Sequence, residues 1–249
     1  MPRTIESSIA AHERLVTKLE SDSRLSDEDR EAVRQLPFTV KDLPRGVDIV
    51  RDGDRPAECC LVVSGLVCRY KLLLGGKRQI LSFHLAGEIP DLQSLFLKRM
   101  DHSLAAITPV RAAFIPHAAL RALVGSRPSV AAILWRETLI DAAIFREWIV
   151  GLGRRTAMQR VAHLLCELAV RFRAVGLAGD HHYTLPVTQS ELGDAVGISN
   201  IHVSRVLRDL RDAGLVLVSG GTVTTLNWDG LVELSEFDPD YLHLTRPEP

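Results

Sequence analysis

The strongest constraint on the fold is the segment TQSELGDAVGISNIHVSRVLRDLRDAG at residues 188–214. Its apolar residues recur at helical spacing in two short blocks. Two helices that cross at a steep angle need a small residue where they touch and a residue that tolerates positive φ in the turn. Gly193 and Gly197 meet these two needs, and Ser199 is well placed to cap the second helix. The segment therefore predicts a helix-turn-helix.

Short β-prone runs frame this motif. Residues 183–185 precede it, and residues 215–218 and 222–226 follow it, separated by Ser219-Gly220-Gly221. The two later runs predict a hairpin, which would form a wing. A helix-turn-helix match by itself is weak, because corners between two helices are common. The full order of strand, helix, turn, helix and hairpin is far more specific and predicts a winged helix-turn-helix that binds DNA.

The second helix of this motif is expected to present an outward face to the DNA. Arg205 can donate two hydrogen bonds to O6 and N7 of guanine, and Arg208 is better placed for a phosphate. Thr188 and Gln189 begin the first helix, where hydroxyl, amide and backbone N–H groups suit a phosphate. For each arginine, the alternative is a solvated surface residue. The candidate DNA contacts are Thr188, Gln189, Ser199, Asn200, Ile201, His202, Ser204, Arg205 and Arg208.

The N-terminal half has a different pattern of helix and strand signals. Residues 4–36 favour short helices, with a helix start at Ser26. From Phe38 to about Pro116, short β-prone runs alternate with turn signals, which predicts a compact β-roll or barrel. The adjacent Cys59 and Cys60 lie in one such run, so their side chains should point to opposite faces.

A long helix is expected from Pro128 to about Val150. Its apolar residues form two stripes, which suggests that one faces the chain's own β-domain and the other a second copy of the helix. A single broad face buried within a monomer is the alternative. Gly151-Leu152-Gly153 is expected to break this helix as a hinge, and another helix should run from Thr156 to about Ala174. The stripes are Ile133, Ile140 and Ile144, and Leu134, Phe145, Trp148 and Leu152.

Composition excludes several classes of protein. Hydrophobic residues make up 46% and charged residues 24%, which is typical of a globular protein. No apolar run approaches the ~18–20 residues that cross a bilayer. The first 20 residues do not resemble a secretory signal, so we expect a cytoplasmic protein with no membrane partner. The net charge of −1 does not by itself favour nucleic acid.

Catalysis and metal binding find little support. No Ser/His/Asp grouping, metal-ligand cluster or phosphate-binding loop stands out, so no catalytic residue or metal site is predicted. The four cysteines show no C-x-x-C spacing, and we expect reduced thiols packed as small hydrophobic groups. A redox role for the first three remains open. The cysteines are Cys59, Cys60, Cys68 and Cys166.

Over nearly its whole length the chain resembles the Crp/Fnr family of bacterial regulators. The C-terminal signature is the segment at 188–210, and a looser pattern lies at Gly53-Asp54, residues 61–65 and Gly87-Glu88. The resemblance implies an α+β fold, with an N-terminal β-roll of the cyclic-nucleotide-binding-like jelly-roll type. A long dimerisation helix would join it to a C-terminal winged helix-turn-helix. Members of the family bind two-fold DNA sites and recruit or block RNA polymerase.

The chain departs from the family pattern in the sensor half. Cyclic-AMP-responsive members place an Arg-Ser or Arg-Thr pair on the cyclic phosphate, and the matching pair here is His102-Ser103, with Arg99 displaced along the loop. Histidine is a poor substitute for a bidentate arginine, so a cyclic nucleotide is not the expected ligand. The candidate effector-binding residues are Gly87, Glu88, Arg99, His102 and Ser103.

The residues that would bind an iron–sulfur cluster, haem or a DNA base also depart from the family pattern. No cysteine precedes Cys59, so the family's N-terminal iron–sulfur cluster is not expected. His84 and His102 are candidate haem ligands only because they lie in the sensor domain. The alternative is that both histidines have structural roles. Many members place a glutamate four residues before the arginine that here is Arg205. That position is Ile201, which suits a thymine methyl, so a different DNA sequence is expected.

These observations predict a homodimeric, sequence-specific transcriptional regulator that is not an enzyme. We divide the chain into a helical segment at 1–36, a sensor domain at 37–126, a dimerisation helix with hinge at 127–153 and a DNA-binding domain at 154–249. The partners would be double-stranded DNA, RNA polymerase and a small-molecule effector whose identity the sequence leaves open. The alternative is a cyclic-nucleotide-responsive module that acts mainly through protein contacts.

Overall fold

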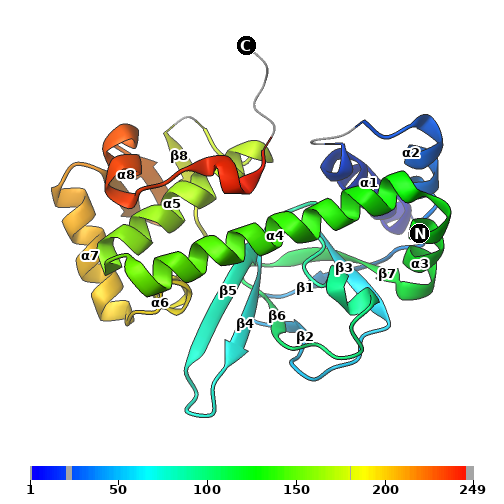
Figure 1. Cartoon of the computed structure of the whole chain (residues 1–249), viewed down its shortest axis with the longest axis horizontal. Coiled ribbons are helices and arrows are strands. Elements are labelled where there is room, and N and C mark those ends of the chain that lie inside the picture. Colours follow the sequence, from blue (N-terminus) through cyan, green and yellow to red (C-terminus); the bar gives the residue numbers. More distant parts are fainter. Residues whose placement is uncertain (1, 21–23, 180, 245–249) are drawn as a thin grey trace. The chain divides into compact units, whose positions relative to one another are not determined.

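The computed structural model describes residues 2–20, 24–179 and 181–244 of the 249-residue chain. The chain forms two compact units (Figure 1). Of the described residues, unit 1 comprises 2–20, 24–71 and 82–141, and unit 2 comprises 72–81, 142–179 and 181–244. Residues 1 and 21–23 of the predicted N-terminal segment, and residues 180 and 245–249 of the predicted DNA-binding domain, lie outside the described residues.

Two N-terminal helices precede the strands of unit 1. The first, α1 (Pro2–Leu19), is a single helix of 18 residues rather than the short pieces that the sequence predicted. It buries Leu15 and Leu19, four residues apart on one helical face. The second, α2 (Asp27–Arg34), begins where predicted, because the Ser26 hydroxyl accepts a hydrogen bond from the backbone N–H of Asp29 at 3.1 Å.

The predicted β-roll is present, and most of its residues belong to unit 1. One sheet has the order β1-β7-β3 and the other β2-β6-β4-β5. The strands and one short 3₁₀ helix are β1 (Thr39–Leu43), β2 (Asp48–Val50), β3 (Glu58–Ser64), β4 (Val67–Leu72), β5 (Arg78–His84), η1 (Leu92–Leu95), β6 (Ser103–Ala106) and β7 (Val110–Pro116).

Strand β3 is buried on both faces. Cys59 and Leu61 pack in a core cluster with residues of α1 and α2, whereas Cys60 and Val62 pack in a second cluster with residues of the other sheet. This alternation confirms that the two adjacent cysteines point to opposite faces. It also explains why the strand is a continuous apolar run, because both faces are covered.

Two helices follow the strands, α3 (His117–Ser126) and the long α4 (Pro128–Arg154). The predicted break at Gly151-Leu152-Gly153 is wrong, because α4 continues through these residues to Arg154. A glycine in a helix costs only about 1 kcal/mol relative to alanine and creates no clash. The ladder continues past it, since the backbone N–H of Arg155 donates to the Gly151 carbonyl at 3.1 Å.

The predicted stripes of α4 are only partly correct. Leu134 of one predicted stripe and Ile144 of the other are both buried within their own chain, so neither stripe is exposed as a whole. Leu152 of a predicted stripe is exposed (39%), but the most exposed apolar residues of the helix belong to neither stripe: Trp135 (69%) and Leu139 in the first half, and Ile149 (68%) in the second. A one-residue shift along a helix rotates the face by about 100°, which explains the error.

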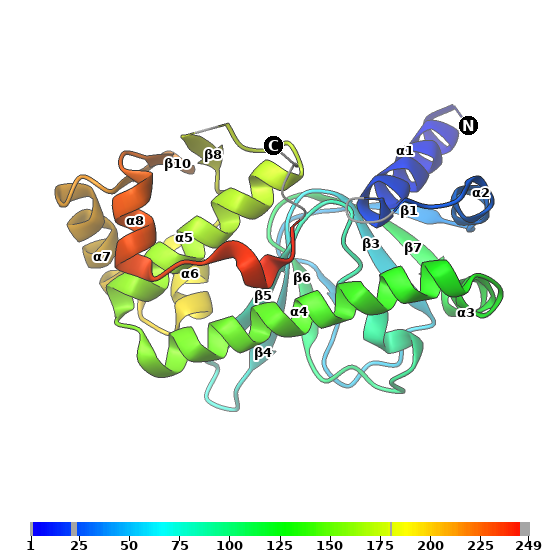
Figure 2. The same ribbon diagram turned by 45° about the horizontal axis from the view of Figure 1, so that its top comes forward.

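The predicted winged helix-turn-helix is present in unit 2 (Figures 1 and 2). The three-stranded sheet has the order β8-β10-β9, and α8 packs on α5. The elements are α5 (Ala157–Ala174), β8 (His182–Thr184), α6 (Gln189–Val196), α7 (Asn200–Asp212), β9 (Val216–Ser219), β10 (Thr222–Thr225), α8 (Trp228–Ser235) and the 3₁₀ helix η2 (Pro239–Leu242).

A buried carboxylate joins three elements of unit 2. Glu167 on α5 is fully buried. It accepts hydrogen bonds from Trp148 Nε1 of α4 at 2.9 Å, from the Tyr241 hydroxyl of η2 at 2.8 Å and from Arg171 Nη1 at 3.1 Å. The partners satisfy both carboxylate oxygens, so the charge is tolerated inside the core. The network fixes the C-terminal half of α4 to α5.

Candidate DNA-binding surface and sensor site

The turn between α6 and α7 has the geometry that its glycines predicted. A Cβ atom on Gly193 would lie 2.5 Å from the Ile198 carbonyl oxygen, so only glycine fits where the helices touch. Gly197 ends α6 in the left-handed conformation with φ of +69°. Leu192, Val203 and Leu210 are buried, so they form the inward face of the two helices.

Polar caps fix the start of both helices. The Ser199 hydroxyl accepts a hydrogen bond from the His202 backbone N–H at 3.3 Å, as predicted. Thr188 and Glu191 form a capping box, in which the Thr188 hydroxyl accepts from the Glu191 N–H and donates to the Glu191 carboxylate. The Thr188 hydroxyl is therefore occupied within the chain. The exposed Gln189 amide remains available for a phosphate.

The remaining candidate DNA contacts share one exposed face. Asn200, Ile201, His202, Ser204, Arg205 and Arg208 are all exposed on α7. Beside them lies a groove with a volume of about 310 Å³, between α6, α7 and the wing strand β9. Its lining residues are Gln189, Ser204, Arg205, Leu207, Arg208, Arg211, Leu217 and Val218.

Three arginines follow one another at three-residue spacing on this helix, and their partners differ. Arg208 lies 3.7 Å from the Asp209 carboxylate, and Arg211 donates to Asp212 at 2.7 Å. Arg205 forms no ion pair with any residue that the structure describes. Its guanidinium is thus the most available of the three. Sequence reasoning missed Arg211, although its spacing from Arg208 was a usable signal.

The candidate effector residues divide into two groups in unit 1. Gly87 adopts φ of +97° beneath α1, where a Cβ would lie 3.0 Å from the Lys18 Cβ, and the Glu88 carboxylate hydrogen-bonds His84 Nδ1 at 2.9 Å. The second group meets the turn at residues 52–53. There Arg99 Nε donates to the Gly53 carbonyl, and the Ser103 hydroxyl accepts from the Asp52 N–H.

Both candidate haem histidines are buried and hydrogen-bonded at both ring nitrogens. His84 contacts Ser82 and Glu88, and His102 contacts Gln93 and Asp101. Burial lowers the pKa of each imidazole, and the positive charge of Arg69 lowers the pKa further. These contacts favour structural roles for the two histidines.

Arg69 is the buried cation of this region, and sequence reasoning missed it. Its Nε donates to the Pro90 carbonyl at 2.7 Å, and its Nη1 pairs with the Asp141 carboxylate on α4. The guanidinium is therefore occupied by partners from the chain itself. The available signal was an arginine in an apolar strand, since such a residue is rarely buried unless paired.

Asp91 is a second buried group that the sequence did not reveal. It has no exposed surface, and its Oδ1 accepts a hydrogen bond from the Cys60 N–H at 2.7 Å. Its Oδ2 has no hydrogen-bond partner among the described residues. Burial raises the pKa of this carboxyl from 3.8 to about 7. The charge of Asp91 therefore changes near neutral pH.

The cysteines are free thiols, and all four are buried. Burial raises the pKa of Cys59 and of Cys166 to about 12, so each thiolate is scarce at neutral pH. Within the described ranges, no group of three or more histidine, cysteine or acidic residues has the geometry to hold a metal ion. In the same ranges, no helix is long and apolar enough to cross a membrane.

Comparison with known proteins identifies both halves of the chain. Residues 40–127 match the cyclic nucleotide-binding domain, and residues 159–234 match the Crp-like helix-turn-helix domain. The nitrogen fixation regulation protein FixK of Azorhizobium caulinodans is 30% identical over 172 residues, which is 69% of this chain and 68% of that protein. The transcriptional activator protein FnrA of Stutzerimonas stutzeri is 26% identical over 211 residues, or 85% and 86% of the two chains.

A solved structure extends this similarity to the fold. The structure of FixK2 from Bradyrhizobium japonicum matches with a TM-score of 0.74 and 30% sequence identity. The match covers 80% of this chain and 98% of that one. The FixK and FnrA relatives bear the names of regulators, and neither name describes a catalytic activity.

Proposed function

This chain belongs to the Crp/Fnr family of DNA-binding transcriptional regulators, and we propose that it acts as a homodimer on a two-fold DNA site. The observation that carries the proposal is the exposed face of α7 from Asn200 to Arg208, next to the wing and with Arg205 unpaired among the described residues. A helix with such a face fits a major groove. A protein that acts on the bacterial chromosome would work in the cytoplasm.

We assign different roles to the residues of this face. Arg205 would recognise guanine through two hydrogen bonds, and Ile201 would pack on a thymine methyl. Arg208 and Gln189 would contact phosphates, which position the protein without recognising sequence. Ser199, Asn200, His202 and Ser204 would lie at the groove, and Thr188 would act through its backbone, because its hydroxyl is held by Glu191.

The dimer would use the exposed apolar residues of α4. Trp135 and Leu139, four residues apart in the first half of the helix, and Ile149 and Val150 in the second half are exposed. Exposed large apolar side chains gathered on one element are typical of a protein interface. A second copy of α4 would cover them and set the two α7 helices on one duplex.

The sensor domain would respond to a ligand other than a cyclic nucleotide. His102 stands where the responsive members place an arginine, and it is buried and bound by Asp101 and Gln93. The nearby buried arginine, Arg69, already pairs with Asp141. The DNA-bound dimer would then recruit or block RNA polymerase.

Fluorescence anisotropy with a DNA site selected from a random pool tests the proposal. The wild type should bind that site with a strong salt dependence, because each phosphate contact releases counterions. Arg205→Ala should lose about 1–3 kcal/mol of specific affinity for each half-site, while its affinity for unrelated DNA changes little. Arg55→Ala, at an exposed arginine of unit 1, is the matched control and should bind like the wild type.

Two outcomes would contradict the proposal. DNA affinity that does not depend on salt would favour a regulatory module that acts through protein contacts. Equal losses of specific and non-specific affinity in Arg205→Ala would show that Arg205 does not recognise a base.

A further inference from the structure

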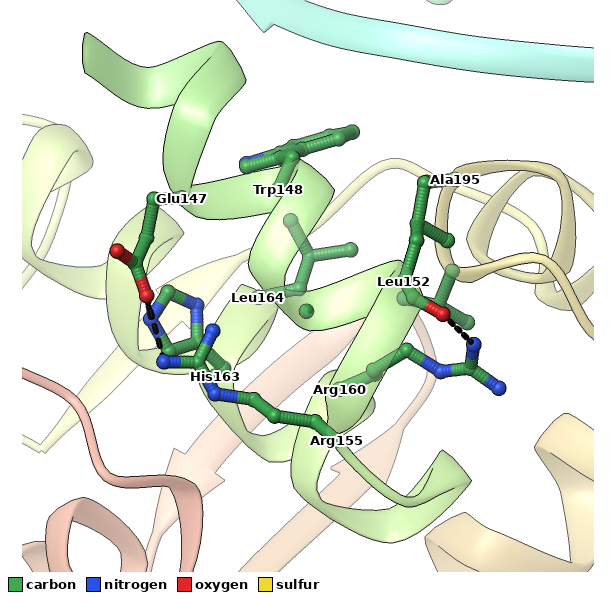
Figure 3. A pocket seen from close by; sticks show the side chains of 10 residues that line it. Glu147, Trp148, Leu152, Arg155, Arg160, His163, Leu164 and Ala195 are labelled. Carbon is green, nitrogen blue, oxygen red and sulfur yellow. Dashed lines mark hydrogen bonds and ion pairs between the residues drawn. The ribbon is translucent and has the colours of Figure 1, made fainter.

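A second site lies in unit 2, away from the DNA-binding face. It is a cavity of about 30 Å³ between the end of α4, the start of α5 and the end of α6, here called the α4–α6 pocket. Figure 3 shows Glu147, Arg155 and His163 gathered on one side of the pocket, with Arg160 beside Leu152 on the other. The lining residues are Glu147, Trp148, Gly151, Leu152, Arg155, Arg160, His163, Leu164, Ala195 and Val196.

Three residues that line this pocket each hold a buried nitrogen atom with no hydrogen-bond partner in the described part of the chain: Nε of Arg155, Nε of Arg160 and Nε2 of His163. The side chains of Arg155 and His163 are only 8% and 6% exposed. A buried donor left without an acceptor costs about 1–3 kcal/mol, and the Nε atoms of both arginines always carry a proton, so this pair of donors calls for a ligand that can accept.

The existing contacts do not satisfy these atoms. Arg155 Nη2 donates to Glu147 Oε1 at 2.5 Å, and Arg160 Nη1 makes a long contact of 3.4 Å with the Leu152 carbonyl. His163 Nε2 lies 3.4 Å from the same Glu147 oxygen without a hydrogen bond. In each guanidinium, a terminal N–H is in use and the Nε–H remains.

The charges of the pocket favour a ligand with one negative charge. Burial, and then the charge of Arg155, lowers the pKa of His163 to about 4, so the imidazole is neutral at physiological pH. The two guanidinium groups and the Glu147 carboxylate therefore leave one positive charge in excess. A dianion would carry more negative charge than the pocket can neutralise, and Glu147 would repel it.

The size and walls of the pocket narrow the ligand further. A cavity needs a volume of about 10–15 Å³ to hold one water molecule. The α4–α6 pocket, at about 30 Å³, therefore admits a group of a few heavy atoms. Leu152, Leu164 and Val196 supply apolar walls that suit a methyl group. Guanidinium N–H groups match the planar, two-oxygen geometry of a carboxylate.

We propose that the α4–α6 pocket binds a small monocarboxylate of the size of formate or acetate. Its oxygens would accept hydrogen bonds from the unpaired Nε–H groups of Arg155 and Arg160, and its remaining atoms would contact the apolar wall. The bound anion would join the end of α4 to α6, the first helix of the helix-turn-helix.

Saturation-transfer NMR with acetate tests this site on the full-length protein. No DNA is present, so the result does not depend on the proposed function. The ionic strength is held constant with chloride. The wild type should show saturable binding of acetate, and Arg160→Gln should weaken it about tenfold or more, because a charge-assisted hydrogen bond is lost. The exposed Arg173 at the far end of α5 provides the control, and Arg173→Gln should bind acetate like the wild type.

A size comparison on the wild type keeps the test independent of any variant. Benzoate carries the same carboxylate on a ring too large for 30 Å³, so it should not compete with acetate. Absence of saturable acetate binding would overturn the proposal. Equal binding by the three proteins, or displacement of acetate by benzoate, would also overturn it.

Discussion

Replacing Asp91 with asparagine removes a titrating carboxyl from the core of unit 1. The new side chain would keep an oxygen that accepts from the Cys60 N–H, and its amide nitrogen would stand where the unpaired Oδ2 now lies. Burial raises the pKa of Asp91 from 3.8 to about 7. Between these two values the folded protein holds a proton that the unfolded chain releases, so this carboxyl makes the fold less stable as the pH rises from about 4 to 7.

The magnitude follows from that shift. A pKa shift of about 3 units, at roughly 1.4 kcal/mol per unit, corresponds to about 4 kcal/mol. The free energy of unfolding of Asp91→Asn, relative to that of the wild type, should therefore be about 4 kcal/mol higher at pH 8 than at pH 4. Urea unfolding followed by circular dichroism at each pH measures the free energy of unfolding of both proteins. The difference between them isolates Asp91, because the other titrating groups are common to both. Asp229→Asn, at an exposed carboxylate of unit 2, is the matched control. A difference that stays constant from pH 4 to 8 would refute the reasoning.

Three further changes test the packing of unit 2 and the pocket. Glu167→Ala should lower the free energy of unfolding by about 3–5 kcal/mol, because Arg171 and two other donors lose a buried acceptor; urea unfolding measures this, with the exposed Glu233→Ala as control. Gly193→Ala should cost about 1–3 kcal/mol through its clash with the Ile198 carbonyl, and unchanged stability in the same assay would contradict the contact. His163→Phe should flatten the fall in stability from about pH 6.5 to 4, because the folded imidazole resists the proton that the unfolded chain accepts; a pH series compares it with the wild type.

Local signals allowed the helix-turn-helix to be predicted from sequence. Gly193, Gly197 and Ser199 each meet a requirement set by neighbours within a few residues, namely a close contact, a positive φ and a helix cap. The same is true of Ser26 at the start of α2. Such requirements are local, and they were met in the structure.

Features that depend on distant parts of the chain were not predictable. Arg69 pairs with Asp141, 72 residues away, and nothing near either residue indicates the other. Asp91 lies in a stretch with loop character, and its burial follows from the packing of β3 against η1. Gly151 and Gly153 suggested a break because glycine weakens helices, but packing of neighbours such as Trp148 decided the outcome.

A hydroxyl-radical footprint of the full-length protein on its selected DNA tests the central claim most directly. Two α7 helices that enter successive major grooves should protect two segments whose centres lie about 10 bp apart on one face of the duplex. Arg205→Ala should lose both protected segments together, since the two halves are equivalent. Protection of a single asymmetric half-site by a monomer would contradict the account.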